Sequence, residues 1–240
     1  MTLVLRQLEP ELLDMLPADD SRAKRARRDL QRVNIIMGQA AIWKRIMKIA
    51  ALPQAPRVIV ELGAGDGTLM LRLARTWVAQ WPHVKLYLVD RKPAIAGATL
   101  DVFKSLGWNA EAVVAEATDW LTRMPPADII VTNLFLHHFD DAPLADLLRR
   151  IAQKTHVFVA CEPRRSKTAL IGSQLLGLIG CGPVARYDAV VSVRAGFTGA
   201  ELSALWPEKH RWQVHEHGAG LFGHCFLARR NSVTDSPAQA

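Results

Sequence analysis

The fold class that this sequence predicts is α/β, and three observations predict it. From residue 57 onward, short runs of apolar, β-branched residues alternate with amphipathic stretches of helical period. The first run, Val58–Leu62, leads directly into three glycines on alternate positions. The last two runs are joined by a short link that contains Gly218 and Gly220, which predicts an antiparallel hairpin. We therefore expect a doubly wound, mainly parallel seven-stranded sheet with a C-terminal antiparallel hairpin and an N-terminal helical extension.

Length and composition fit one domain with an appended segment. The chain has 240 residues, half of them apolar, and can bury a substantial core. We expect an N-terminal helical cap over 1–56, the main domain over 57–230 and a flexible tail over 231–240. The net charge of +7 permits an acidic partner without requiring one, since many globular enzymes carry such a charge.

The expected compartment is the cytoplasm. The three cysteines form no C-x-x-C pair, which argues against a disulfide framework or zinc site and for a reducing compartment. Acids interrupt the leucines near the N-terminus, unlike in a signal peptide. The longest apolar stretch, Ala169–Cys181, is too short to span a bilayer, so no transmembrane segment is expected.

The elements follow from the alternating pattern. Strands are predicted at Val58–Leu62, Val84–Asp90, Ala112–Ala115, Asp128–Asn133 and His156–Cys161. Helices are predicted between them at Thr68–Gln80, Pro93–Leu106, Asp119–Met124 and Ala142–Gln153. The remaining segments are predicted as an apolar helix over Ser166–Gly182, an irregular or strand-like segment over Arg186–Ala195, a short helix over Gly199–Trp206, and hairpin strands over Trp212–His217 and Leu221–Ala228.

The N-terminal extension carries a long helical pattern. It runs from about Arg22 to Ala51, as one helix or as two that are broken near Gly38. Its first turns are rich in basic residues, namely Arg22, Lys24, Arg25, Arg27, Arg28 and Arg32. They predict either a solvated helix face, or a basic cap over a ligand cleft or a site for phosphate or anionic lipid.

The glycine segment is the strongest functional signal. Glycine allows positive φ and lets backbone N–H groups approach a ligand without a Cβ between them. A strand, a glycine turn and a helix N-terminus together form a nucleotide-binding corner. The spacing here is G-x-G-x-G, whereas dinucleotide oxidoreductases use G-x-G-x-x-G.

This spacing resembles the first motif of the class I S-adenosylmethionine (SAM) methyltransferases, and the end of each following strand agrees with that family. The segment that begins with Asn133 and contains His137 and His138 resembles the small-molecule and quinone-modifying branch. The resemblance covers about 57–229 and implies a SAM-binding methyltransferase domain. The cofactor-binding residues that it implies are Glu61, Gly63, Ala64, Gly65, Gly67, Asp90, Arg91, Asp119, Trp120 and Asn133.

Each implied role has a structural alternative. Asp90 would accept hydrogen bonds from the ribose hydroxyls, and Asp119 would lie beside the adenine amino group with Trp120 over the ring. Glu61 and Asp90 could instead be solvated acids at strand ends, and Asp119 could cap a helix. A dehydrogenase also remains an alternative.

A general base would assist transfer to a hydroxyl, and His137 and His138 are the candidate catalytic residues. Histidine has the unperturbed pKa nearest neutrality, and the pair follows a strand at the edge where ligands bind. Of the two we favour His138, with a structural role for the pair as the alternative.

Other polar residues are weaker candidates for the acceptor site. They are Arg164, Arg165, Tyr187, Asp188 and Arg194, which could grip an anionic group or simply close a strand. The hairpin histidines His215, His217 and His224 lack a completing acid or cysteine, and no metal site is predicted.

The predicted function is SAM-dependent methylation of a small, largely apolar aromatic, polyketide-like or quinone-like acceptor, most probably at oxygen. The apolar helix Ala169–Cys181 could form a lid over such an acceptor or could be plain core. Carbon methylation of the same class, an RNA or protein methyltransferase, and a non-catalytic SAM-binding module are the alternatives. Nucleic acid is not the expected partner, and the oligomeric state is left open.

Overall fold

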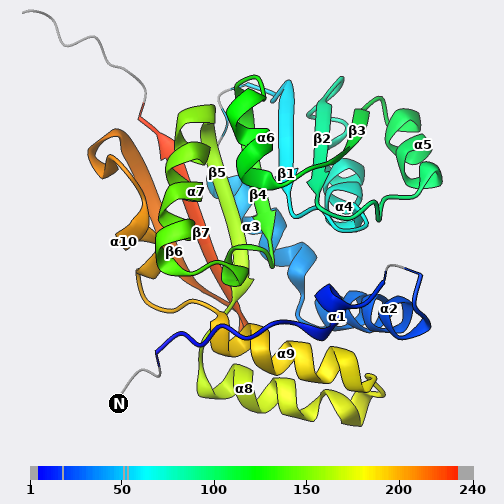
Figure 1. The fold of residues 1–240 in the computed structure, drawn as a ribbon. Helices are drawn as coiled ribbons and strands as arrows, with labels where there is room; N and C mark the ends of the chain where they lie inside the picture. The colour runs from blue at the N-terminus through cyan, green and yellow to red at the C-terminus, as the bar shows by residue number, and fades with distance from the viewer. Residues whose placement is uncertain (1–4, 18, 51, 53, 232–240) are drawn as a thin grey trace, which may run out of the picture.

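The computed structural model describes residues 5–17, 19–50, 52 and 54–231. Apart from Asn231, the expected tail lies outside the described residues. Seven strands form one sheet in the order β3-β2-β1-β4-β5-β7-β6 (Figure 1). Their bounds are β1 Val58–Leu62, β2 Lys85–Asp90, β3 Asn109–Val114, β4 Ala127–Asn133, β5 Thr155–Pro163, β6 Trp212–Ala219 and β7 Gly223–Arg230. The first five strands are parallel and β7 is antiparallel to both neighbours, so the predicted fold class is confirmed.

Helices cover both faces of the sheet. One face carries α3 (Gln39–Ala50), α4 (Thr68–Trp77) and α5 (Gly97–Ser105). The other carries α6 (Ala117–Arg123), α7 (Asp141–Lys154) and α10 (Glu201–Leu205). Successive side chains of a strand point to opposite faces, so Ile59 enters one core and Val60 the other. Burial on both faces explains why the central strands are continuous apolar runs.

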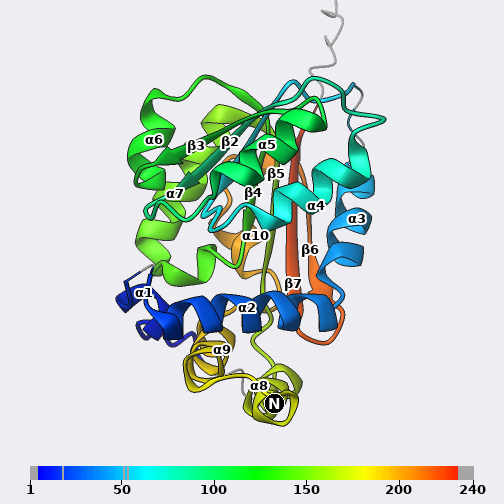
Figure 2. The same cartoon turned by 90° about the vertical axis from the view of Figure 1, so that its right-hand side faces the viewer.

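A lid lies beyond the carboxyl ends of the parallel strands (Figures 1 and 2). It consists of α1 (Leu12–Met15), α2 (Ser21–Ile36), α8 (Lys167–Gln174), the short 3-10 helix η2 (Leu175–Ile179) and α9 (Pro183–Ala195). Asp20 caps α2 by accepting a hydrogen bond from Arg22 N, and Gly38, at φ +65°, separates α2 from α3. The predicted N-terminal helical pattern is therefore two helices.

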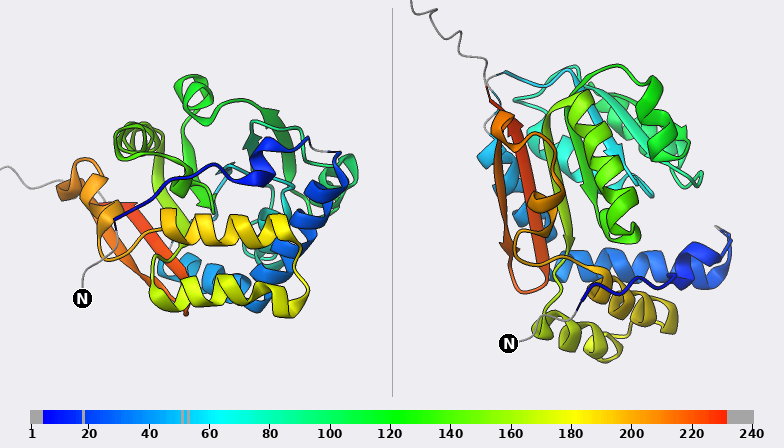
Figure 3. Two further views of the ribbon diagram at one scale, coloured as in Figure 1. Left: turned by 60° about the horizontal axis from the view of Figure 1, so that its bottom comes forward. Right: turned by 60° about the vertical axis from the view of Figure 1, so that its left-hand side comes forward.

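Buried Asp29 of α2 joins the N-terminal part of the lid to α9, because its Oδ2 accepts a hydrogen bond from Gly182 N at 2.8 Å. The N-terminal segment runs alongside α9 towards α1 (Figure 3). Arg6 fastens it by donating to Ala195 O at 3.0 Å and to Phe139 O at 2.9 Å. The segment therefore acts as a strap across the lid.

Three sequence-based predictions need correction. Arg186–Ala195 is part of helix α9 and is neither irregular nor strand-like. Its valines favour a strand locally, but Pro183 at the helix start and burial of Ala185, Val191 and Ala195 stabilise a helix. The hairpin turn lies at 220–222 and overlaps the predicted link only at Gly220. Strand β3 begins at Asn109, three residues before its predicted start.

Among the described residues, no helix combines the length and the apolar character that crossing a membrane would require.

Phe158 of β5 tests the packing of the second core. Its side chain is fully buried, stacks on Trp206 at 5.4 Å between ring centroids and contacts Phe226. We expect Phe158→Ala to lower the free energy of unfolding by about 3–5 kcal/mol, because it leaves a cavity. Val114→Ala on the exposed edge of β3 is the control and should cost about 0.5 kcal/mol. Urea titration measures both, and equal losses would contradict this packing.

Candidate active site

The glycine loop follows β1 at the carboxyl edge of the sheet. Gly63, Gly65 and Gly67 all have positive φ, at 72°, 53° and 75°. A Cβ on Gly63 would lie 2.4 Å from Phe135 Cδ2, whereas a Cβ on Gly65 would meet nothing within 4 Å. Gly63 is therefore required by packing, and Gly65 presents its backbone to open space.

Asp90, at the end of β2, holds the loop in place. Its Oδ2 accepts a hydrogen bond from Gly65 N at 2.8 Å, and its Oδ1 accepts one from Lys92 N at 2.9 Å. Each carboxylate oxygen keeps a further lone pair for a ligand.

Glu61 is the buried acid beneath the loop. It is 2% exposed, and among the described residues its Oε2 has no hydrogen-bond partner. Burial, and then the negative charges of Asp66 and Asp90, hold the pKa of Glu61 well above its ordinary value. A cation placed here would stabilise its charged form.

Two cavities meet at the glycine loop. One has a volume of about 370 Å³ and lies against α3 and α4, with Glu61, Ala64 and Asn133 in its wall. The other has a volume of about 850 Å³ and lies under the lid. Gly63, Gly65 and Leu134 line both cavities, so the loop divides one continuous binding region.

The rim of the larger cavity is polar in one part and apolar in another. Exposed lining residues of the polar part include Asp14, Arg91 and Glu116. Exposed lining residues of the apolar part are Ile36, Leu175 and Ile179. A ligand with one polar and one apolar portion suits such a cavity.

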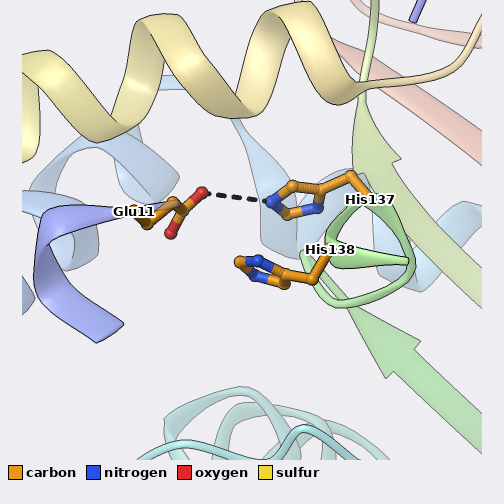
Figure 4. A group of neighbouring side chains, drawn as sticks. All are labelled: Glu11, His137 and His138. Atoms are coloured by element: carbon orange, nitrogen blue, oxygen red, sulfur yellow. Dashed lines mark hydrogen bonds and ion pairs between the residues drawn. The ribbon is translucent and has the colours of Figure 1, made fainter. Parts of the chain in front are cut away.

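His137 lies between two carboxylates, those of Glu162 and Glu11, and Figure 4 shows the contact with Glu11. Its Nδ1 is 2.8 Å from Glu162 Oε2, and its Nε2 is 3.3 Å from Glu11 Oε1. Burial disfavours the charged ring, but the hydrogen bonds and charges of Glu11 and Glu162 outweigh it and raise the pKa of His137 to about 9. His137 is therefore an imidazolium at neutral pH, with both nitrogens donating.

Glu162, at the end of β5, also shapes the loop that carries both histidines. Its Oε1 accepts hydrogen bonds from Phe135 N at 3.1 Å and Leu136 N at 3.0 Å. These bonds fix the start of the 3-10 turn η1 (Leu136–His138), and so the position of His138.

His138 lines the larger cavity, with 32% of its side chain exposed. Its ring centroid is 4.2 Å from that of His137. Burial first, and then the positive charge of His137, lower the pKa of His138 below its ordinary value. The pair therefore divides into one charged ring and one neutral ring, and the neutral ring can accept a proton.

Ligand atoms of Glu11, His137 and His138 lie within 4.8 Å of one another, as in a group that could hold a metal ion. A charged imidazolium has no lone pair with which to bind a metal ion. The ion pairs of His137 with Glu11 and Glu162 therefore explain why these side chains lie together, and no metal ion is needed. The absence of a metal ligand stays a prediction.

The strap closes over this region. Asp188 of α9 accepts hydrogen bonds from Leu12 N at 2.7 Å and Leu13 N at 3.1 Å, and burial raises the pKa of Asp188 to about 6. Lys92 Nζ donates to Asp14 O at 2.8 Å. His137, through Glu11, and Asp188 and Lys92 thus hold the strap from three different parts of the chain.

Most predicted site residues come together. Those that line one of the two cavities are Glu61, Gly63, Ala64, Gly65, Asp90, Arg91, Asn133, His137 and His138. Gly67 instead caps α4 without lining either cavity. Their roles toward a ligand stay predictions.

Asp119 and Trp120 line neither of the two cavities, so their contact with the cofactor stays a prediction. Asp119 is exposed on α6, and Trp120 is buried against Tyr87, with ring centroids 5.2 Å apart. Glu116 and Ala117, three residues earlier, line the cavity instead. Glu116 is therefore a second candidate for the cofactor acid at the end of β3.

Of the weaker candidates for the acceptor site, only one lines a cavity. Asp188 lines the cavity, whereas Arg164, Arg165, Tyr187 and Arg194 do not line either cavity. Arg165 pairs with Glu201, and Glu216 holds His224 at 2.8 Å.

Sequence reasoning missed Glu11, Glu116 and Glu162. Glu116 and Glu162 follow or end parallel strands, and that position could have identified them. Nothing in the sequence relates Glu11 to His137, because 126 residues separate them.

Residues 59–156 match the model of a methyltransferase domain. No curated protein is similar enough in sequence to count as a relative. Several solved structures share the fold. The plantazolicin methyltransferase BamL, in complex with a triazolic desmethylPZN analog and SAH, is 12% identical, with a TM-score of 0.61 over 85% of this chain and 90% of that one.

Two longer proteins are also similar. An O-methyltransferase family protein from Burkholderia thailandensis is 16% identical, with a TM-score of 0.59 over 90% of this chain and 62% of that one. The mitomycin 7-O-methyltransferase MmcR is 18% identical, with a TM-score of 0.57 over 91% and 60%. Residues 59–156 are therefore similar to a methyltransferase domain, and the chain has the fold of the class I, Rossmann-like SAM-dependent methyltransferases. The cofactor of this class is SAM.

Glu116 and Asp119 give a direct test of which acid contacts the cofactor. We expect Glu116→Ala to weaken binding of S-adenosylhomocysteine about tenfold, because it removes a carboxylate acceptor from the cavity wall. Asp119→Ala should leave the affinity unchanged, because that side chain is exposed on α6. Isothermal titration calorimetry measures both, and the reverse order would restore Asp119 as the cofactor acid.

The charge of His137 predicts how stability depends on pH. A pKa raised from 6.5 to about 9 on folding stabilises the protein fully below pH 6.5, and this stabilisation is lost as pH rises to about 9. We expect the loss to be on the order of 3 kcal/mol at most. His137→Gln should remove this component, so the difference between wild type and variant should shrink from pH 6.5 to 9 in urea titrations. A constant difference would mean that His137 is neutral in the folded protein.

Proposed function

We propose that this protein transfers a methyl group from SAM to an oxygen atom of a small, largely apolar acceptor. The observation that carries the proposal is the 850 Å³ cavity, which joins the glycine loop and strand-end acids to an apolar lid and contains a neutral histidine.

The residues present fit the cofactor. Gly65 leaves open space beside its backbone, and Asp90 and Glu116 place acceptors at the ends of β2 and β3 for ribose hydroxyls and an adenine amino group. Glu61 and Asn133 would lie beside the amino-acid end of SAM, where Glu61 would stabilise the positively charged amino group. When bound, SAM supplies a methyl group on a positively charged sulfur.

The acceptor would occupy the apolar part of the cavity. Side chains of Leu30, Val33, Met37, Leu176 and Phe222 line it, and its size suits an aromatic, polyketide-like or quinone-like compound. The strap and lid exclude water and hold the acceptor in line, which is the main task in methyl transfer.

His138 would act as the general base. As a neutral imidazole it can accept the proton of an acceptor hydroxyl. The neighbouring imidazolium of His137 keeps that ring neutral and would stabilise the negative oxygen that forms. Glu11 and Glu162 are positioning residues, because they act through His137.

Carbon methylation of the same class of acceptor is the second candidate, since a phenolate is also nucleophilic at its ring carbons. A deep cavity partly covered by a strap and lid favours a small molecule over RNA or protein. Incubation with labelled SAM and extracts of the source cell, followed by identification of the labelled product, tests the proposal. Asp90→Ala should abolish both SAM binding and labelling, and unchanged affinity in that variant would overturn the proposal.

With the acceptor identified, His138→Gln should lower kcat about 100-fold while SAM affinity stays within twofold. The wild-type rate should fall below pH 6.5, because acid protonates a base whose pKa is lowered, and the variant should lack this limb. The pH profile of kcat/KM measures this fall in rate for both proteins. If the variant keeps the fall at acid pH, the general base is a residue other than His138.

A further inference from the structure

The outer side of the lid carries large apolar side chains in contact with solvent. Ile171, Leu175 and Leu178 are 57, 51 and 83% exposed. They recur every three or four residues along α8 and η2 and so form one stripe. Figure 1 shows α8 on the side of α9 that faces away from the sheet. The inner side of the same segment lines the cavity through Ala169, Ser173 and Leu176.

A second stripe on α2 continues this surface. Arg25, Arg28 and Arg32 are exposed at helical spacing, and Ile35 and Ile36 follow them, each 63% exposed. Arg32 Nη2 donates to Ile179 O at 2.9 Å, which places this stripe beside η2.

The surface is positively charged. Lys167 is exposed at the start of α8, and no acidic residue occurs in the sequence between Glu162 and Asp188. Arg25 and Arg32 share the single buried carboxylate of Asp29, so their combined charge stays positive. Basic residues around exposed aliphatic side chains are complementary to an anionic lipid surface.

The surface is continuous with the mouth of the cavity. Ile36, Leu175 and Ile179 are exposed and also line the 850 Å³ cavity. An apolar molecule held at this surface would therefore lie next to the opening of the cavity.

We propose that this surface, the lid face, docks on an anionic phospholipid membrane and receives the apolar acceptor from it. The lid face comprises the apolar residues Ile35, Ile36, Ile171, Leu175, Leu178 and Ile179 and the basic residues Arg25, Arg28, Arg32 and Lys167. The occupant is a bilayer surface because aliphatic side chains insert among acyl chains while basic side chains contact phosphate groups. The inference rests on the proposed function only in that the acceptor is apolar.

Vesicle co-sedimentation tests the proposal on the full chain. We expect binding to vesicles of phosphatidylglycerol and phosphatidylcholine, weak binding to phosphatidylcholine alone, and weakening by salt. Ile171→Ser with Leu178→Ser should lower the partition coefficient at least tenfold, as should Arg28→Gln with Lys167→Gln. None of these four residues lines a cavity.

Ile49→Ser with Lys104→Gln, two exposed positions on α3 and α5, is the matched control and should bind as wild type does. S-adenosylhomocysteine affinity should be unchanged in every variant, which shows that each is folded. Equal vesicle binding by lid-face and control variants would overturn the proposal. So would a dimer in sedimentation velocity that the lid-face variants disperse, or tight RNA binding that they abolish. Vesicle binding requires no acceptor, so its failure leaves the methyltransferase proposal standing.

Discussion

The ion-paired chain Glu162–His137–Glu11 is the constraint on which the rest of the site depends. It joins the end of β5, the loop after β4 and the N-terminal strap through one buried imidazolium. Two ionised carboxylates can both be stabilised by one buried histidine ring only if that ring is charged. That charge in turn lowers the pKa of His138. One arrangement therefore closes the cavity and also sets the state of the candidate base.

The sheet could be predicted from the sequence because its signals are local. The central parallel strands are mostly apolar, and the glycine spacing marks the turn after β1. Helix α9 could not be predicted this way, because its valines favour a strand and only packing in the lid makes it helical. The start of β3 was predicted three residues late, because this exposed edge strand has no sharp sequence boundary.

The candidate site was predictable where strand ends carry polar residues and not where distant segments meet. Asp90, Asn133 and the histidine pair each follow or end a parallel strand. Glu11 and Asp188 reach the cavity from the strap and from α9, and nothing local indicates this. The division of the histidines into a charged and a neutral ring also requires the folded structure, because it depends on which ring meets the carboxylates.

The most direct measurement of the central claim is the charge of each histidine at neutral pH. Nitrogen-15 NMR of the imidazole rings, assigned with His137→Gln and His138→Gln, distinguishes an imidazolium from a neutral ring. We predict that His137 is charged up to a pH of about 9, while His138 is neutral at pH 7 and titrates below 6.5. A neutral His137 at pH 7, or a charged His138, would contradict the account.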